Sequence, residues 1–325
     1  MIRSFVFNQG KLVGQDLDID SLKLVLHDKG LQLWVDMEAS SDEEAKQVLD
    51  GVFAYHPLAI EDCLTLSERP KVDEYETYLF LVIHAVDCTK GAREFRTTEL
   101  DIFMGKDYLV TFHREPLRSI SATVDRVLKS AASVARAPDR LTHTILDFLF
   151  ENYQPVLDEL SAGIAELEEE MLTARPSTDI LADVVRTKKQ VAKLLQIVAP
   201  QREVIARFGR GEFKFVRAHL VPYYRDLFDV LARISGRAES YRESLNTSLD
   251  VHLNLQQMQV NQIIKVLTVL ATLSLPIVVV TTYYGMNFPF VEYHWSEPVA
   301  LLWVFGSTGV VTGLLYLWLK RKGWL

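Results

Sequence analysis

The stretch VLTVLATLSLPIVVVTTYYGM, residues 266–286, contains 21 residues and no charged side chain. A second uncharged stretch, PVALLWVFGSTGVVTGLLYLWL, follows at residues 298–319 and is 22 residues long. A helix needs about 20 apolar residues to cross the hydrocarbon core of a bilayer. Core helices of soluble proteins rarely run this far without a charge on any face. The sequence therefore predicts two transmembrane helices, joined by an external loop at residues 287–297.

The charges around these spans predict the orientation of the chain in the lipid bilayer. The tail, residues 320–325, contains Lys320, Arg321 and Lys322, whereas the loop between the spans has no Lys or Arg. Positive charge favours the cytoplasmic side, and two spans return the chain to the side on which it starts. We therefore expect a multi-pass protein of the cell inner (plasma) membrane, with cytoplasmic amino and carboxyl termini.

The rest of the chain is acidic. The net charge is −8, of which residues 263–319 contribute −1 and the tail +3, so residues 1–262 carry −10. An acidic region of this kind argues against a nucleic-acid partner. The two cysteines, Cys63 and Cys88, are expected to stay reduced in the cytoplasm.

Residues 1–135 are predicted to form a cytoplasmic α/β domain. Ser41-Asp-Glu-Glu44 is a capping box, which predicts a helix through about Val52. The short turn Gly105-Lys-Asp107 predicts a hairpin between the strands that flank it. Strand-like runs occur at residues 31–35, 78–86, 99–104 and 108–113.

Helical patterns begin after Pro138. Apolar residues at spacings of three and four on both sides of the break at 174–178 predict a helical hairpin within residues 136–221. Pro155 is expected to kink the first helix or to mark a junction. A stalk helix is expected at 222–286, opened by Pro222 and continuing into the first span at about residue 266. Such a helix is roughly 90 Å long, so we expect it to pack against copies of itself.

Enzyme motifs are missing from the sequence. It has no His-Glu-x-x-His zinc motif, no Gly-x-Ser-x-Gly nucleophile turn and no Gly-x-x-x-x-Gly-Lys phosphate loop. We therefore do not expect an enzyme.

The first span ends in Tyr284-Gly-Met-Asn-Phe288, and here the sequence resembles the CorA family of Mg²⁺ channels, including its ZntB-type metal ion transporters. The Gly-Met-Asn tripeptide, the two-span hairpin and the basic end Lys320-Arg-Lys-Gly-Trp-Leu325 are all similar to that family. Other similar segments are His56-Pro-Leu-Ala-Ile-Glu-Asp62, Arg69-Pro-Lys71 and Tyr223-Tyr-Arg-Asp226.

The resemblance implies a funnel-shaped homo-oligomer, a pentamer, that conducts Mg²⁺ into the cytoplasm down its electrochemical gradient. Co²⁺ and Ni²⁺ are expected to pass as well, because their hydrated ions are similar in size. Gly285, Met286 and Asn287 then form the selectivity filter. Mg²⁺ dehydrates reluctantly, and a ring of neutral Asn287 amide oxygens can accept hydrogen bonds from its waters without holding the ion tightly.

The resemblance also assigns a pore face on the first span. The family's pore-facing positions correspond here to Asn261, Ile264, Leu267, Leu275 and Val278, whose spacing fits one helical face. Rings of Ile264 and Leu267 are expected to act as the gate, because a narrow aliphatic ring blocks ions by dewetting. Val278 stands where relatives often have a polar residue.

A cytoplasmic metal sensor is implied at Asp62 and Asp226, with Glu61 as a weaker contributor. Two carboxylates from neighbouring subunits repel until a divalent ion bridges them. Internal Mg²⁺ then holds the closed arrangement, and its loss releases the subunits.

The external loop is short and acidic. Glu292 and Glu297 are expected to attract cations by electrostatic focusing, although the loop lacks the Met-Pro-Glu-Leu stretch that relatives often have. His294 beside Glu292 leaves a zinc site open. In the second span, Gly309 and Gly313 are small residues four apart, which allows close helix packing in lipid.

Two other functions remain open from the sequence. A ZntB-like transporter would couple Zn²⁺ uptake to a proton gradient and shares the fold and the tripeptide. A membrane-anchored scaffold or sensor would form a sealed oligomer that conducts no ions.

Overall fold

The computed structural model describes residues 1–28, 30–67, 69–87, 94–173, 178–286 and 297–324. Its residues form two compact units, Met1–Ser248 and Leu249–Leu325. The first unit contains both the residues expected for the α/β domain and the helical region that follows them. The long helix α8, Val221–Gly285, contributes to both units.

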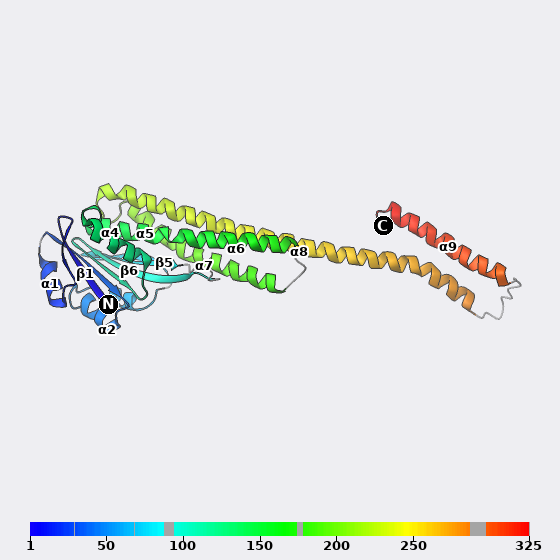
Figure 1. Cartoon of the computed structure of the whole chain (residues 1–325), viewed down its shortest axis with the longest axis horizontal. Coiled ribbons are helices and arrows are strands. Elements are labelled where there is room, and N and C mark those ends of the chain that lie inside the picture. Colours follow the sequence, from blue (N-terminus) through cyan, green and yellow to red (C-terminus); the bar gives the residue numbers. More distant parts are fainter. Residues whose placement is uncertain (29, 68, 88–93, 174–177, 287–296, 325) are drawn as a thin grey trace. The chain divides into compact units, whose positions relative to one another are not determined.

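The described residues of the first unit include a mixed seven-stranded sheet, and helices α6 to α8 extend beyond it (Figure 1). Its order is β2-β1-β3-β7-β6-β5-β4, and among the described strands only β3 and β7 pair in parallel. The predicted hairpin is confirmed, since β6 and β7 are antiparallel around residues 106–107. The strands are β1 Ile2–Asn8, β2 Lys11–Gln15, β3 Leu31–Glu38, β4 Lys71–Glu74, β5 Tyr78–Asp87, β6 Arg96–Gly105 and β7 Tyr108–His113.

The two faces of the sheet are covered by different helices. One face packs on α1 (Ile19–His27), α2 (Asp42–Leu49) and α3 (Pro57–Leu64). The other face packs on α4 to α8, of which α4 is Arg118–Val134. Strand β5 has apolar side chains on both faces. Phe80 and Val82 point into the core beside α1 to α3, and Leu79, Leu81 and Ile83 point into the core beside α4 to α8.

Local signals in the sequence define several helix boundaries. The Ser41 side chain accepts from the Glu44 N–H at 3.3 Å while the Glu44 carboxylate accepts from the Ser41 N–H at 3.0 Å, so the predicted capping box is confirmed. Pro155 lies in the first turn of α6 (Tyr153–Thr173), just after α5 (Pro138–Glu151) ends, and thus marks the expected junction. α6 and α7 (Thr178–Gly209) run antiparallel as the predicted hairpin (Figure 1).

Strand β4 pairs with β5 only from Leu79 to Val82. After Val82, side chains from the helices take the place of a strand along that edge of β5. At His84, the backbone N–H donates to Gln201 Oε1 at 2.9 Å, and the backbone carbonyl accepts from the Tyr153 hydroxyl at 2.6 Å. Gln201 Nε2 closes the ring by donating to the Tyr153 hydroxyl at 2.7 Å. Tyr153 belongs to α6 and Gln201 to α7, so this buried ring of hydrogen bonds fixes both helices against the sheet.

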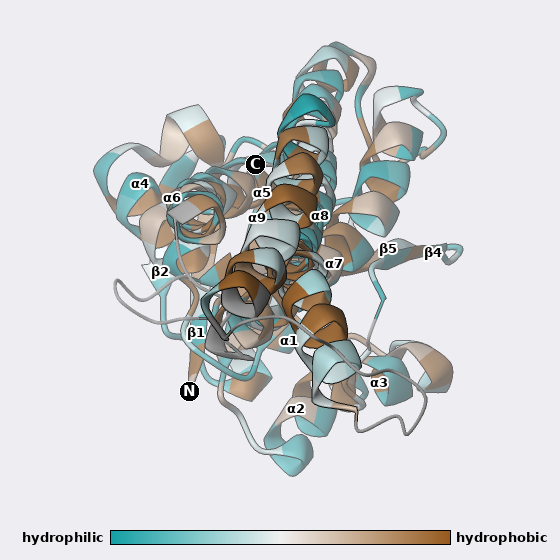
Figure 2. Ribbon diagram, turned by 90° about the vertical axis from the view of Figure 1, so that its right-hand side faces the viewer, coloured by the Kyte–Doolittle hydropathy of each residue, from teal (hydrophilic) through white to brown (hydrophobic). Residues whose placement is uncertain are grey.

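The second unit contains the C-terminal part of α8 and α9, Glu297–Arg321. Both helices have windows long and apolar enough to cross a membrane, and α9 is brown or white over most of its length in Figure 2. Their large apolar side chains are mostly exposed in the single chain, as expected where lipid or other subunits cover them. Pro276 lies inside α8 without ending it, as predicted for a membrane helix.

The end of α9 has a Schellman motif. The Trp324 N–H donates to the Leu319 carbonyl and the Gly323 N–H to the Lys320 carbonyl, each at 3.1 Å. Gly323 has a φ of +73°, which only glycine adopts without strain. The motif ends the helix within the basic tail, residues 320–325.

We expect Gln201→Leu to lower the free energy of unfolding by about 2–3 kcal/mol, because it leaves the His84 N–H buried without an acceptor. Thermal unfolding of the detergent-solubilised protein measures the change. Gln196→Leu, the same substitution on the exposed side of α7, is the control and should leave the melting temperature nearly unchanged. Equal melting temperatures for the two variants would contradict the role assigned to the ring.

Two buried carboxyl groups lie on the same side of β6. Glu99 and Asp101 are two residues apart on the strand and are 8% and 1% exposed. Glu99 accepts from the Ser67 N–H at 2.7 Å, and Asp101 Oδ1 has no hydrogen-bond partner among the described residues. Burial raises the pKa of Glu99 from 4.5 to about 7. Burial, with the nearby charge of Glu99, raises the pKa of Asp101 well above its ordinary value.

These pKa shifts predict a pH-dependent stability. Because the folded protein binds the Glu99 proton more tightly than the unfolded chain, stability should fall as the pH rises from about 4.5 to 7. Glu99→Gln removes this ionisation and can still accept from Ser67. We expect its melting temperature to match that of the wild type near pH 4.5 and to exceed it increasingly up to pH 8. The exposed Glu94→Gln is the control, and a difference independent of pH would refute the assignment.

Candidate pore helix and acidic sites

The predicted pore stripe lies on one helix, α8. Its aliphatic members are 54–64% exposed in the single chain. The Asn261 amide oxygen accepts from Gln257 Nε2 at 3.1 Å. The stripe consists of Asn261, Ile264, Leu267, Leu275 and Val278, all within α8.

A different side of α8 faces α9. Lys265 Nζ donates to the Gly323 carbonyl at 2.9 Å, and one turn further along each helix Val269 and Leu319 are buried, at 8% and 3% exposure. On a helix of 3.6 residues per turn, Lys265 and Val269 point well away from Ile264 and Leu267. The stripe is therefore left uncovered by the chain's own second span.

The glycines of α9 lie in open space within the described part of the chain. No described atom lies within 4 Å of where a side chain would begin at Gly306, Gly309 or Gly313. The close packing predicted for Gly309 and Gly313 is therefore not made with α8 of the same chain, and it stays a prediction for neighbouring molecules.

The filter tripeptide falls at the end of α8. Gly285 is the last helical residue, and Met286 follows it with its side chain 51% exposed. Asn287, Glu292 and His294 lie outside the described residues. Glu297 begins α9, and its side chain is likewise outside the described part of the structure.

Asp62 lies on α3 beside two charged residues of β4. Lys71 Nζ is 2.5 Å from Asp62 Oδ2 and 3.2 Å from Asp73 Oδ2. Burial alone would lower the pKa of Lys71, but hydrogen bonds to these two carboxylates raise it above its ordinary value. Glu61, the neighbouring residue, is exposed. The sequence did not predict that Lys71 pairs with Asp62, because the pairing depends on β4 lying against α3.

Asp226 is exposed near the start of α8. The helix is held there by α5: the Tyr224 hydroxyl donates to the Asp139 carbonyl at 2.8 Å, and His143 packs edge-on against the Tyr224 ring. Burial lowers the pKa of His143, while the negative charges of Asp147 and Asp226 act in the opposite direction. Since α3 and α8 cover opposite faces of the sheet, one chain does not bring Asp62 and Asp226 together.

A buried carboxylate anchors the segment before α8. Asp139 is 2% exposed, and its carboxylate accepts three hydrogen bonds from the Arg217 guanidinium, at 2.7, 2.8 and 3.2 Å. It also accepts from the Arg217 backbone N–H at 3.0 Å. Arg217 precedes the short helix η1, Ala218–Leu220, which leads directly into α8. This ion pair therefore fixes the segment from which α8 begins.

One further group has the spacing of metal ligands among the described residues: Asp36, Glu38 and His113. Arg3 Nη2 already contacts both carboxylates, at 2.7 Å from Asp36 and 3.3 Å from Glu38. His113 Nε2 lies 3.2 Å from Asp36, which also accepts from the Thr111 hydroxyl at 2.6 Å. The Arg3 guanidinium thus provides the positive charge that a metal would supply, and we interpret the cluster as structural.

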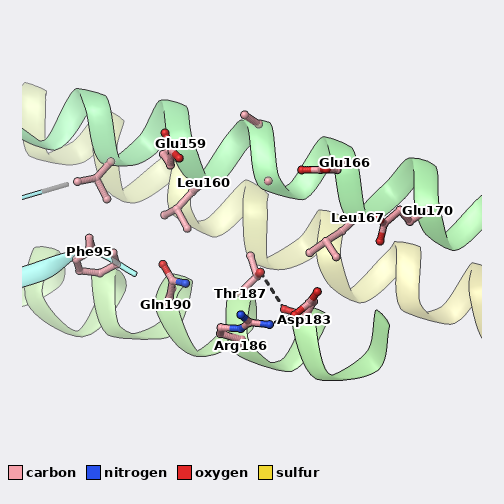
Figure 3. Close-up of a pocket in the computed structure, with 13 residues that line it drawn as sticks. Phe95, Glu159, Leu160, Glu166, Leu167, Glu170, Asp183, Arg186, Thr187 and Gln190 are labelled. Atoms are coloured by element: carbon pink, nitrogen blue, oxygen red, sulfur yellow. Dashed lines mark hydrogen bonds and ion pairs between the residues drawn. The ribbon is translucent and has the colours of Figure 1, made fainter. Parts of the chain in front are cut away.

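An acidic hollow of about 450 Å³ lies between α6 and α7 (Figure 3). Glu159, Glu166 and Glu170 line it from α6. On α7, Asp183 forms an ion pair with Arg186 and accepts, through its backbone carbonyl, from the Thr187 hydroxyl at 3.0 Å. The hollow adds to the negative charge of the first unit but contains none of the predicted site residues.

The comparisons with known proteins agree with this architecture. The model of the CorA-like Mg²⁺ transporter protein family matches residues 31–321. The cobalt/magnesium transport protein CorA of Thermotoga maritima is 28% identical over 313 residues, 95% of this chain and 87% of its own. The complete CorA magnesium transporter structure from Methanocaldococcus jannaschii superposes with a TM-score of 0.80 at 20% identity, covering 99% of this chain and 98% of its own. The full-length CmaX structure gives 0.75 at 17% identity.

An α/β unit, a long helix and two C-terminal apolar helices define a membrane protein with two transmembrane helices. Because the family model covers most of the chain, the protein belongs to the CorA-like Mg²⁺ transporter family.

We expect Arg217→Met to lower the free energy of unfolding by about 3 kcal/mol, since it leaves the Asp139 carboxylate buried without its cation. Arg210→Met is the control: it breaks a comparable contact, 2.6 Å from Arg210 to Glu212, but at the surface. Surface pairs contribute little, so only the first variant should melt at a clearly lower temperature. Similar melting temperatures would contradict the anchoring role of Asp139.

Proposed function

We propose that copies of this chain form a channel that conducts divalent cations, chiefly Mg²⁺, into the cytoplasm down their electrochemical gradient. The observation that carries the proposal is the uncharged stripe on α8, which stays exposed beside the chain's own α9 and leads to Gly285 and Met286. An exposed aliphatic stripe on a membrane helix can face lipid, a partner helix or a pore. The name of the Thermotoga maritima relative, a cobalt/magnesium transport protein, favours the pore and the ions.

The oligomer that fits this arrangement is a funnel-shaped pentamer. The α8 helices would form the inner ring with the stripe towards the axis, and the α9 helices would form the outer ring against lipid. The open faces at Gly309 and Gly313 would then meet neighbouring helices. Both termini would lie in the cytoplasm, with Lys320 to Lys322 at the inner membrane surface.

Ions would be selected at the outer end of α8 and gated at its inner end. A ring of Asn287 amides, turned inward after Gly285, would accept hydrogen bonds from the waters of Mg²⁺. Co²⁺ and Ni²⁺ would pass by the same means. Rings of Ile264 and Leu267 would close the pore by excluding water. Glu292 and Glu297 would concentrate cations at the outer mouth.

Cytoplasmic Mg²⁺ would regulate the channel at Asp62 and Asp226 of neighbouring subunits. Both carboxylates lie at the surface of the first unit on different elements, which suits a site shared between chains. Carboxylate oxygens are the ligands that Mg²⁺ prefers, and it usually keeps several waters. Glu61 would add negative charge to the site. Bound Mg²⁺ would favour the closed state, and the loss of Mg²⁺ would release the subunits from that state.

We expect Asn287→Ala to abolish Mg²⁺ entry into proteoliposomes, followed with an internal Mg²⁺-sensitive dye. Ser307→Ala on α9 is the control, because the only partner of its hydroxyl among the described residues is the Val304 carbonyl of its own helix, and entry should persist. Entry unchanged in Asn287→Ala would refute the filter. If the wild type admits Zn²⁺ but not Mg²⁺, the zinc transporter is the better account, and if it admits neither ion, a non-conducting scaffold is.

The double variant Asp62→Ala, Asp226→Ala should still conduct but should lose inhibition by Mg²⁺ on the cytoplasmic side. Patch recordings with stepped internal Mg²⁺ measure this directly. Asp20→Ala with Asp125→Ala removes two exposed carboxylates elsewhere and serves as the control. Inhibition that survives in the first pair would exclude the proposed sensor.

A further inference from the structure

The ammonium group of Lys71, on the same chain, lies beside the Asp62 carboxylate. Lys71 Nζ lies 2.5 Å from Asp62 Oδ2, and 3.2 Å from Asp73 Oδ2 on its other side. The three side chains are 33–45% exposed, so ions from solution can reach them.

The fold positions this ammonium group. Lys71 and Asp73 are two residues apart on β4 and therefore point to the same side of the strand. β4 is an edge strand whose register places Lys71 opposite Val82 of β5. The ammonium also lies 5.6 Å from the centre of the Phe80 ring, a favourable cation–π distance. The group can therefore move between Asp62 and Asp73 without leaving the site.

We infer that Lys71 is a tethered competitor that sets how much cytoplasmic Mg²⁺ is needed to occupy Asp62. This inference rests on the proposed function of Asp62 as a ligand of the regulatory ion. A carboxylate oxygen in contact with an ammonium cannot also contact Mg²⁺ or one of its waters in the same place. The ion must displace Lys71, and Asp73 provides a second anion to receive it.

The arrangement has a regulatory consequence. A positive charge at contact distance repels an approaching divalent ion and weakens its binding. Because Lys71 is attached to the chain, its local concentration does not vary with conditions, and it raises the Mg²⁺ concentration at which the site fills. The sensor would thus stay empty at low internal Mg²⁺, although both of its proposed ligands are carboxylates.

The test is the midpoint for Mg²⁺ binding to the full-length, detergent-solubilised protein, measured by calorimetry and by the rise of melting temperature with Mg²⁺. Lys71→Met should lower the midpoint about tenfold. Lys71→Arg keeps the charge and should stay close to the wild type. Lys46→Met removes an exposed positive charge on the neighbouring helix α2 and should also leave the midpoint unchanged.

Asp62→Ala separates this inference from the proposed sensor. If Asp62→Ala raises the midpoint while Lys71→Met leaves it within twofold of the wild type, the sensor stands and the competition is refuted. If Asp62→Ala itself has no effect on Mg²⁺ binding, the sensor fails and the inference fails with it. A tenfold decrease in Lys71→Met alone, with Lys71→Arg and Lys46→Met unchanged, supports the competition.

Discussion

The ion pair between the buried Asp139 carboxylate and Arg217 is the contact on which the start of α8 depends. It joins the start of α5 to the segment that leads into α8, and the Tyr224 hydroxyl adds a bond to the Asp139 backbone. Asp139 is almost completely buried, so its charge needs a partner, and Arg217 provides it. The position of Asp226 follows, because it lies less than one turn beyond Tyr224 on the same helix.

Much of the fold could be predicted from local sequence signals. The capping box at Ser41, the turn at Gly105 and the uncharged runs each determine structure within a few residues. The mixed sheet order could not be predicted, because β3 and β7, which pair in parallel, are more than 70 residues apart in the sequence. The Gln201 ring was missed for the same reason: Gln201 contacts His84, 117 residues earlier in the chain, and a glutamine in a helix gives no sign of such a partner.

The candidate sites differ in how much of each could be predicted from the sequence. The pore stripe follows from helical periodicity and family resemblance, and the structure places all five residues on α8. The proposed sensor residues Asp62 and Asp226 lie on helices that cover opposite faces of the sheet, and sequence reasoning did not find Lys71 beside Asp62. Basic residues are common in surface strands, and their pairing is visible only once β4 and α3 are placed together. The filter and external loop depend on residues 287–296 and remain predictions.

We propose a passive pore rather than a coupled transporter, and the driving force for Mg²⁺ entry distinguishes the two. The most direct measurement is Mg²⁺ entry into proteoliposomes containing the wild-type protein, under an imposed membrane potential alone and under a proton gradient alone. The account predicts that entry increases with an inside-negative potential and does not respond to the proton gradient. Entry that requires the proton gradient and is indifferent to the potential would contradict it.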